Sequence, residues 1–172
     1  GPGLMAVSLE RHLVCPSRCP LDCRVGETCW VANYVDVLPG PHAQDFHCQP
    51  RTYDGHDGTD FAIRDLDHMY RGVVVLAADS GTVTAVRNDM EDVLIQQQSL
   101  GAIAGRECGN GLVIDHDGGW QTQYCHLQRG TVRVHRGDRV ARGSELGAAQ
   151  AVAFLDEVDA INQRCRQRVV DL

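Results

Sequence analysis

A histidine and an aspartate lie four residues apart in the segment 53–63, which reads YDGHDGTDFAI. A neutral imidazole and a carboxylate are two of the ligand types found in catalytic zinc sites. Gly55 and Gly58 disfavour a helix here, because each costs about 1 kcal/mol relative to alanine in a helix interior. We therefore expect His56 on a turn and Asp60 at the start of a strand. The alternative is an Asp/Gly-rich turn whose polar side chains cap their own backbone.

A second candidate histidine lies in the segment 108–127, CGNGLVIDHDGGWQTQYCHL. Two runs rich in β-formers flank an Asp-Gly turn signal, which predicts a hairpin. Folding about a centre between residues 116 and 117 places Cys108 opposite Cys125 and predicts a cross-strand disulfide. Because side chains alternate along a strand, His126 is expected on the face opposite to Cys125. A single strand histidine is more often structural than catalytic.

Composition excludes several classes of function. The formal net charge is -7 and the pI is near 5.5, so no basic surface for nucleic acid is expected. All sixteen basic residues are arginine, which excludes a Schiff-base lysine and a P-loop lysine. No apolar run approaches the length of about 18 residues that a membrane-spanning helix needs.

Eight cysteines, an even number, favour disulfides in an oxidising compartment. Residues 1–28 combine prolines with closely spaced cysteines, and we interpret them as a loop-rich arm pinned by disulfides. A structural zinc site is the competing interpretation of this arm, because four cysteines fall within fifteen residues. These four are Cys15, Cys19, Cys23 and Cys29.

Short apolar runs separated by glycine-bearing turns predict a mainly β protein, either a sandwich or a half-barrel. A short helix over 64–70 is expected to stop at Gly72. The segment 88–107 is expected to be an inserted loop. The expected strands are 29–37, 72–78, 81–87, the two arms of the 108–127 hairpin, and short strands within 130–147.

The segments GHDGTDFAI, VLAADSGTVTAV, GNGLVIDHDGGWQTQYCHL and VHRGDRVARGSELG occur in this order. Their order and spacing resemble the lysostaphin/LytM-type zinc metallopeptidases, which cut peptide cross-links in bacterial cell walls. The resemblance covers residues 53–147 and implies an antiparallel β-sandwich or half-barrel. It implies that His56 and Asp60 are the first two zinc ligands. It further implies that His126 assists at the attacking water or the developing oxyanion.

The end of the chain departs from that family, whose last strand bears a His-x-His motif that supplies the third zinc ligand. No such motif occurs here. If 149–161 is a strand, Glu157 and Asp159 point to one face and replace the two histidines. Alternatively, 149–169 is an amphipathic helix, because apolar residues recur there at spacings of three and four. The third ligand is therefore not identified.

Three functions are consistent with these features. The first is a zinc metalloendopeptidase that hydrolyses peptidoglycan cross-links in the periplasm or outside a bacterial cell. The second is a non-catalytic relative that binds wall peptide or regulates another wall hydrolase. The third is a disulfide-stabilised secreted binding module. In each case we expect one β domain over 29–172, with a divergent tail at 148–172, and no oligomeric state is assigned.

Overall fold

The computed structural model describes residues 5–9, 19–92 and 105–150. The candidate ligands Glu157 and Asp159, the tail over 151–172 and the centre of the 88–107 segment lie outside these residues. Within the described part, the chain forms nine strands and one short helix. These are β1 (Met5–Leu9), β2 (Cys29–Asn33), β3 (Thr59–Ile63), α1 (Leu66–Arg71), β4 (Val73–Leu76), β5 (Gly81–Arg87), β6 (Asn110–His116), β7 (Gln121–Leu127), β8 (Arg139–Val140) and β9 (Glu145–Ala149).

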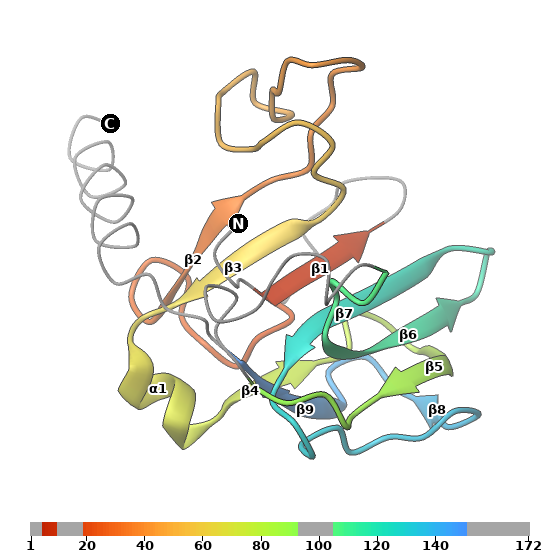
Figure 1. The fold of residues 1–172 in the computed structure, drawn as a ribbon. Helices are drawn as coiled ribbons and strands as arrows, with labels where there is room; N and C mark the ends of the chain where they lie inside the picture. The colour runs from red at the N-terminus through yellow and green to blue at the C-terminus, as the bar shows by residue number, and fades with distance from the viewer. Residues whose placement is uncertain (1–4, 10–18, 93–104, 151–172) are drawn as a thin grey trace.

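The strands build an antiparallel half-barrel, which confirms the predicted fold class (Figure 1). Their order in the sheet is β2-β3-β1-β7-β6-β5-β8. β4 pairs with β9, and β9 also meets the end of β7 through the pair Leu127 and Ala149. The helix predicted over 64–70 is present as α1, and it ends at Gly72, whose φ of 83° is a left-handed conformation that glycine adopts readily. No helix in the described part of the chain is long and apolar enough to cross a membrane.

The sequence pattern predicted a loop-rich N-terminal arm, but part of the arm is a strand. Residues 5–9 form β1, which lies between β3 and β7. Ala6 pairs with Asp60 on one side, and Val7 pairs with Tyr124 on the other. The backbone groups of β3 and β7 that face each other thus find partners in β1, as buried peptide groups require.

The hydrophobic core lies between the β5–β6–β7 part of the sheet and the β4–β9 pair. Buried residues alternate with more exposed ones in the first half of β5 and of β7, as expected for a sheet with one buried face. Tyr124 spans this core, and its hydroxyl accepts a hydrogen bond from the backbone N–H of Ala78 at 2.7 Å. The most deeply buried apolar members are Leu21, Val75, Val83, Leu112, Ile114, Tyr124, Leu127, Leu146 and Ala149.

The 108–127 hairpin and its disulfide are confirmed, but the register differs from the prediction. Cys108 and Cys125 are bonded, with Cα atoms 4.7 Å apart. β6 pairs with β7 through Leu112 and Tyr124, so the hairpin turns about Gly118 rather than between 116 and 117. Cys125 therefore lies opposite Gly111, and Cys108 reaches it from just before β6.

A β-bulge interrupts β7 at Cys125 and His126. Asn110 pairs with Leu127 and Leu112 pairs with Tyr124, so two residues of β7 face one residue, Gly111, of β6. His126 has a φ of 58°, which is uncommon for a residue with a side chain. Gly111 is required at this point, because a Cβ there would lie 2.1 Å from the Tyr124 carbonyl oxygen.

One disulfide also pins the described part of the N-terminal arm. A disulfide joins Cys23 to Cys29 at the start of β2. Before it, Pro20 to Asp22 run along β4, where the Leu76 N–H donates to the Pro20 carbonyl and the Asp22 N–H donates to the Val74 carbonyl, each at 2.8 Å. The arm is thus fixed to both β2 and β4.

The Cys108–Cys125 bond should be a measurable part of the stability. It closes a loop between residues 17 apart in sequence, for which chain entropy predicts about 3 kcal/mol. We expect Cys108→Ser combined with Cys125→Ser to lower the free energy of unfolding by about this amount in urea titrations. The control is Cys48→Ser, which removes an exposed cysteine. Equal midpoints for the two proteins would contradict the expectation.

Candidate metal centre

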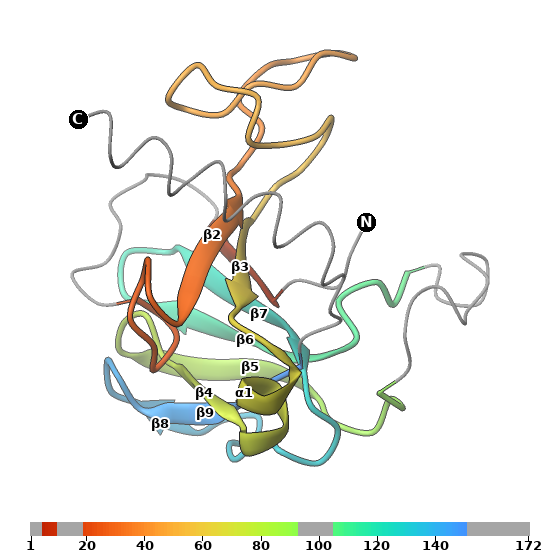
Figure 2. The same ribbon diagram turned by 90° about the vertical axis from the view of Figure 1, so that its left-hand side faces the viewer.

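The predicted ligands lie at the base of a long loop, residues 34–58, that joins β2 to β3 and projects away from the sheet (Figures 1 and 2). Asp36 holds the loop together: its carboxylate accepts hydrogen bonds from the backbone N–H groups of Leu38, Gln44 and Gly55 at 3.0–3.1 Å. These hydrogen bonds keep the pKa of Asp36 below its ordinary value, and those from Gln44 and Leu38 have the largest effect. The loop therefore returns to β3 along a defined path.

His56 lies on a turn directly before β3, as predicted, and only 5% of its surface is exposed. Its Nδ1 is 2.8 Å from the carbonyl oxygen of Tyr34. A carbonyl can only accept, so Nδ1 carries the hydrogen and donates it. This bond fixes the ring, and it directs Nε2 to a point 3.2 Å from Asp60 Oδ2.

Asp60 is the second residue of β3, again as predicted, and it is 6% exposed. Its Oδ2 accepts a hydrogen bond from Asn33 Nδ2 at 2.9 Å. A register shift in the β2–β3 pairing after Val31 places Asn33 directly opposite Asp60. The last residue of β2 thus holds the carboxylate, and the next residue, Tyr34, holds the imidazole.

The environment of His56 favours its charged form when no metal is bound. Burial lowers the pKa of His56, but the hydrogen bonds to Asp60 and to the Tyr34 carbonyl, together with the charges of Asp60 and Asp57, outweigh it. The pKa of His56 therefore lies above its ordinary value. A histidine must be unprotonated at the nitrogen that binds a metal, so the raised pKa makes metal binding at Nε2 weaken as the pH falls.

Aromatic side chains lie on one side of the His56–Asp60 pair, and the sequence did not predict them there. Tyr53 lies against the His56 ring, with centroids 4.4 Å apart, and is half exposed. Its phenol pKa is raised by burial and by the charges of Asp60 and Asp57. Further out, Phe46 packs against Tyr34 and against His47. His47 therefore belongs to the packing of the loop.

His126 comes from the bulge in β7, and its side chain is partly buried. Its backbone is held on both sides: its N–H donates to the Cys108 carbonyl, and its carbonyl accepts from the Gln150 N–H. Burial lowers the pKa of His126, and the charge of Asp60 opposes this shift to a smaller extent. The ring is therefore neutral near pH 7. Because of the bulge, the simple alternation expected between Cys125 and His126 does not apply.

The strands that carry Asp60 and His126 are not neighbours, because β1 lies between them. Two strand spacings separate them, or about 10 Å. Both cross-strand partners of Asp60 are known: Asn33 in β2 and Ala6 in β1, and neither residue type binds zinc. Across residues 5–9, 19–92 and 105–150, no third histidine, cysteine or carboxylate joins His56 and Asp60 in a ligand cluster.

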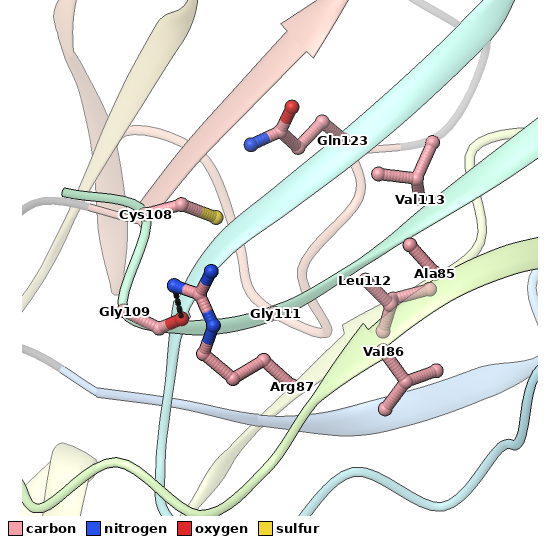
Figure 3. A pocket seen from close by; sticks show the side chains of 9 residues that line it. All are labelled: Ala85, Val86, Arg87, Cys108, Gly109, Gly111, Leu112, Val113 and Gln123. Atoms are coloured by element: carbon pink, nitrogen blue, oxygen red, sulfur yellow. Dashed lines mark hydrogen bonds between the residues drawn. The ribbon is translucent and has the colours of Figure 1, made fainter. Parts of the chain in front are cut away.

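A small hollow lies over β5, β6 and β7, and we call it the Arg87 hollow (Figure 3). Its volume is about 160 Å³. Arg87 provides its charge and donates to the Gly109 carbonyl at 3.2 Å, while Gln123 offers an amide from β7. The hollow is lined by Ala85, Val86, Arg87, Leu112, Val113 and Gln123, among others. A guanidinium and an amide above apolar side chains suit a peptide group or a carboxylate.

The buried histidine and carboxylate, backed by a carbonyl and an amide, form the kind of half-site that zinc hydrolases use. A comparison with protein families identifies the lineage: the profile of Peptidase family M23 matches residues 54–154. This is more than half of the chain, and the chain belongs to that family, as the resemblance to lysostaphin/LytM-type enzymes implied. Members are zinc-dependent and typically cut peptidoglycan. Neither curated proteins nor solved structures gave a significant match.

Asn33 lies outside the matched region, yet it holds the candidate ligand Asp60. We expect Asn33→Ala to weaken zinc binding by roughly 10–100-fold, the usual cost of losing an outer-shell partner. Competition with a chromogenic chelator measures this. The matched control is Asn88→Ala, whose amide bonds only the backbone of Val132 in the interactions described. Equal zinc affinity in the two variants would rule out the role of Asn33.

Proposed function

We propose that this chain is a zinc-dependent metalloendopeptidase that hydrolyses peptide cross-links of bacterial peptidoglycan. The observation that supports this most is the His56–Asp60 pair. Both side chains are buried and their facing atoms are 3.2 Å apart. Asp60 accepts a hydrogen bond from Asn33 at the end of β2, and His56 donates one to the carbonyl of the next residue, Tyr34. Membership of Peptidase family M23 supports the assignment of zinc to this pair.

The donor set fits zinc, because imidazole nitrogen and carboxylate oxygen are both zinc ligands. In this proposal His56 Nε2 and Asp60 Oδ2 hold the ion. When bound, the ion supplies Lewis acidity, which lowers the pKa of water and polarises a peptide carbonyl. The Tyr34 carbonyl keeps the His56 ring in the tautomer that leaves Nε2 available. Asn33 keeps the carboxylate turned towards the same point.

His126 is the proposed catalytic residue. Its lowered pKa leaves the imidazole neutral near pH 7, so one nitrogen can donate a hydrogen bond and the other can accept one. A donor at this position stabilises negative charge that develops on the substrate carbonyl oxygen. The bulge holds the ring at a fixed backbone position, so little reorganisation is needed when the substrate binds.

The proposal also requires a third protein ligand for zinc. Glu157 and Asp159 are the candidates that the sequence offers, and both lie outside the described residues. The two disulfides of the described part, Cys23–Cys29 and Cys108–Cys125, are consistent with an extracytoplasmic location. This supports our proposal that the protein acts in the periplasm or outside a bacterial cell.

Metal content and turnover test this function together. We expect stoichiometric zinc in protein purified without chelators, and loss of that zinc in His56→Ala. His126→Ala should keep the zinc but lower kcat on cross-linked wall fragments by about 10²–10³, the cost of losing one oxyanion donor. His135→Ala is the matched control, because the His135 side chain is 89% exposed. If the protein contains no zinc, and His56→Ala leaves hydrolysis unchanged, the proposal is wrong.

The second candidate function is a non-catalytic relative that binds wall peptide. The absence of a third ligand among the described residues favours it, and the Arg87 hollow offers a place for a peptide carboxylate. In that case Arg87→Gln should weaken binding of a soluble wall peptide, while His56→Ala should leave binding unchanged. If His56→Ala weakens binding and Arg87→Gln leaves it unchanged, the enzyme is favoured instead.

A further inference from the structure

One disulfide of the described part of the chain lies directly beside the proposed catalytic histidine. Cys125, one of its two cysteines, precedes His126 in β7. The carbonyl of the other, Cys108, accepts a hydrogen bond from the His126 N–H at 2.9 Å. The disulfide, the peptide bond between residues 125 and 126 and this hydrogen bond therefore close a small ring, and His126 is one member of it.

The backbone of His126 needs such support. Its φ of 58° lies in the left-handed region, which residues with a side chain adopt only at a cost in free energy. The residue stands at a bulge, where the β6–β7 pairing is interrupted between Asn110 and Leu112. A conformation of this kind persists only where the surrounding structure holds it. The hydrogen bonds to the Cys108 carbonyl and from the Gln150 N–H supply part of that support.

The chain that follows Cys108 lies close to the imidazole itself. Gly109 has a φ of 63°, and a Cβ built on it would lie 3.7 Å from His126 Nδ1. The Gly109 carbonyl accepts a hydrogen bond from Arg87 at 3.2 Å. Residues 108 and 109 precede β6, which begins at Asn110. The disulfide joins this short segment to β7, and it thereby keeps the segment against the histidine.

From this geometry we infer that the Cys108–Cys125 disulfide positions His126, and that its reduction lowers turnover while zinc stays bound. This positioning role rests on the proposed function, in which His126 stabilises charge on the substrate carbonyl. Disulfides persist in oxidising compartments and are rare in the cytosol, where thiols are kept reduced. The bond therefore makes the hydrolase fully active only in an oxidising compartment.

The metal ligands are held from another part of the sheet. Asn33 donates to Asp60, and the carbonyl of Tyr34 accepts from His56. These bonds come from the end of β2 and the residue after it, and β1 separates β3 from β7. Loss of the disulfide is therefore expected to leave zinc affinity unchanged.

A reductant can reach the bond. Cys108 is half-buried and lines the Arg87 hollow together with Gln123 (Figure 3), while Cys125 is buried. A water-soluble phosphine breaks the S–S bond and leaves two thiols. Phosphorus supplies two electrons, and water supplies two protons and the oxygen of the phosphine oxide. A phosphine is preferred to a dithiol, because thiolates bind zinc and would remove it.

Kinetics with and without the phosphine test the inference. In the unmodified protein, reduction should lower kcat by about 100-fold, the cost of misplacing a catalytic group by about 1 Å, with zinc content unchanged. His126→Ala separates positioning from general stability. Its low kcat should not fall further on reduction, because no imidazole remains to be misplaced. An equal fold-loss in His126→Ala and in the unmodified protein would overturn the inference.

Two matched variants assign the effect to this bond. Cys23→Ser combined with Cys29→Ser removes the disulfide of the N-terminal arm and should leave the loss on reduction intact. Cys108→Ser combined with Cys125→Ser should have a low kcat from the start and no further response to the phosphine. A loss that disappears in the first variant, or that persists in the second, would contradict the role of this disulfide.

A reagent that needs no turnover separates this role from the proposed function. Diethyl pyrocarbonate acylates neutral imidazole, and mass spectrometry follows its rate at each histidine. Reduction should raise the rate at His126 several-fold, because the ring loses its fixed place, and should leave the rate at the exposed His135 unchanged. An unchanged rate at His126 would refute the positioning role. A raised rate in a protein that hydrolyses no wall fragment in either state would refute the proposed function and leave the positioning role standing.

Discussion

The last residue of β2 and the residue after it form hydrogen bonds with the two candidate metal ligands, Asp60 and His56. Asn33 donates to the Asp60 carboxylate, and the carbonyl of the next residue, Tyr34, accepts from the His56 ring. These two bonds determine the tautomer of the His56 imidazole, the direction of its free nitrogen, and the Asp60 oxygen that faces that nitrogen. Because β2 precedes the region matched by Peptidase family M23, this support comes from a part of the chain that the family profile does not include.

A buried histidine and a buried carboxylate satisfy each other when no metal is present. Burying an unpaired charge is costly, but here the imidazole and the carboxylate are paired and each has a further hydrogen-bonding partner. The fold therefore does not depend on the metal to neutralise the site. The same pairing opposes metal binding, because the ion must come between two groups that already attract one another.

Local features of the site could be predicted from the sequence, whereas non-local ones could not. The turn at His56, the strand at Asp60 and the Cys108–Cys125 pair follow from glycine positions, alternation and turn chemistry within about twenty residues. Asn33 carries no such signal, because its importance arises from a register shift between two strands. The predicted hairpin register was wrong because it placed Cys108 directly opposite Cys125, whereas the strands turn about Gly118 and Cys108 lies before β6. β1 was missed because both its partners are distant in sequence.

The position of β1 also determines how the sheet can form. Its two partners, β3 and β7, belong to different halves of the sheet, and its pairing with Tyr124 joins residues far apart in the chain. Contacts of this kind are slow to form, because a long loop must close before any pairing compensates for the lost chain entropy. Until β1 inserts, β3 and β7 each present an open edge that can pair with another chain. The insertion of β1 between β3 and β7 is therefore the step that unites the two halves of the sheet and covers these two edges.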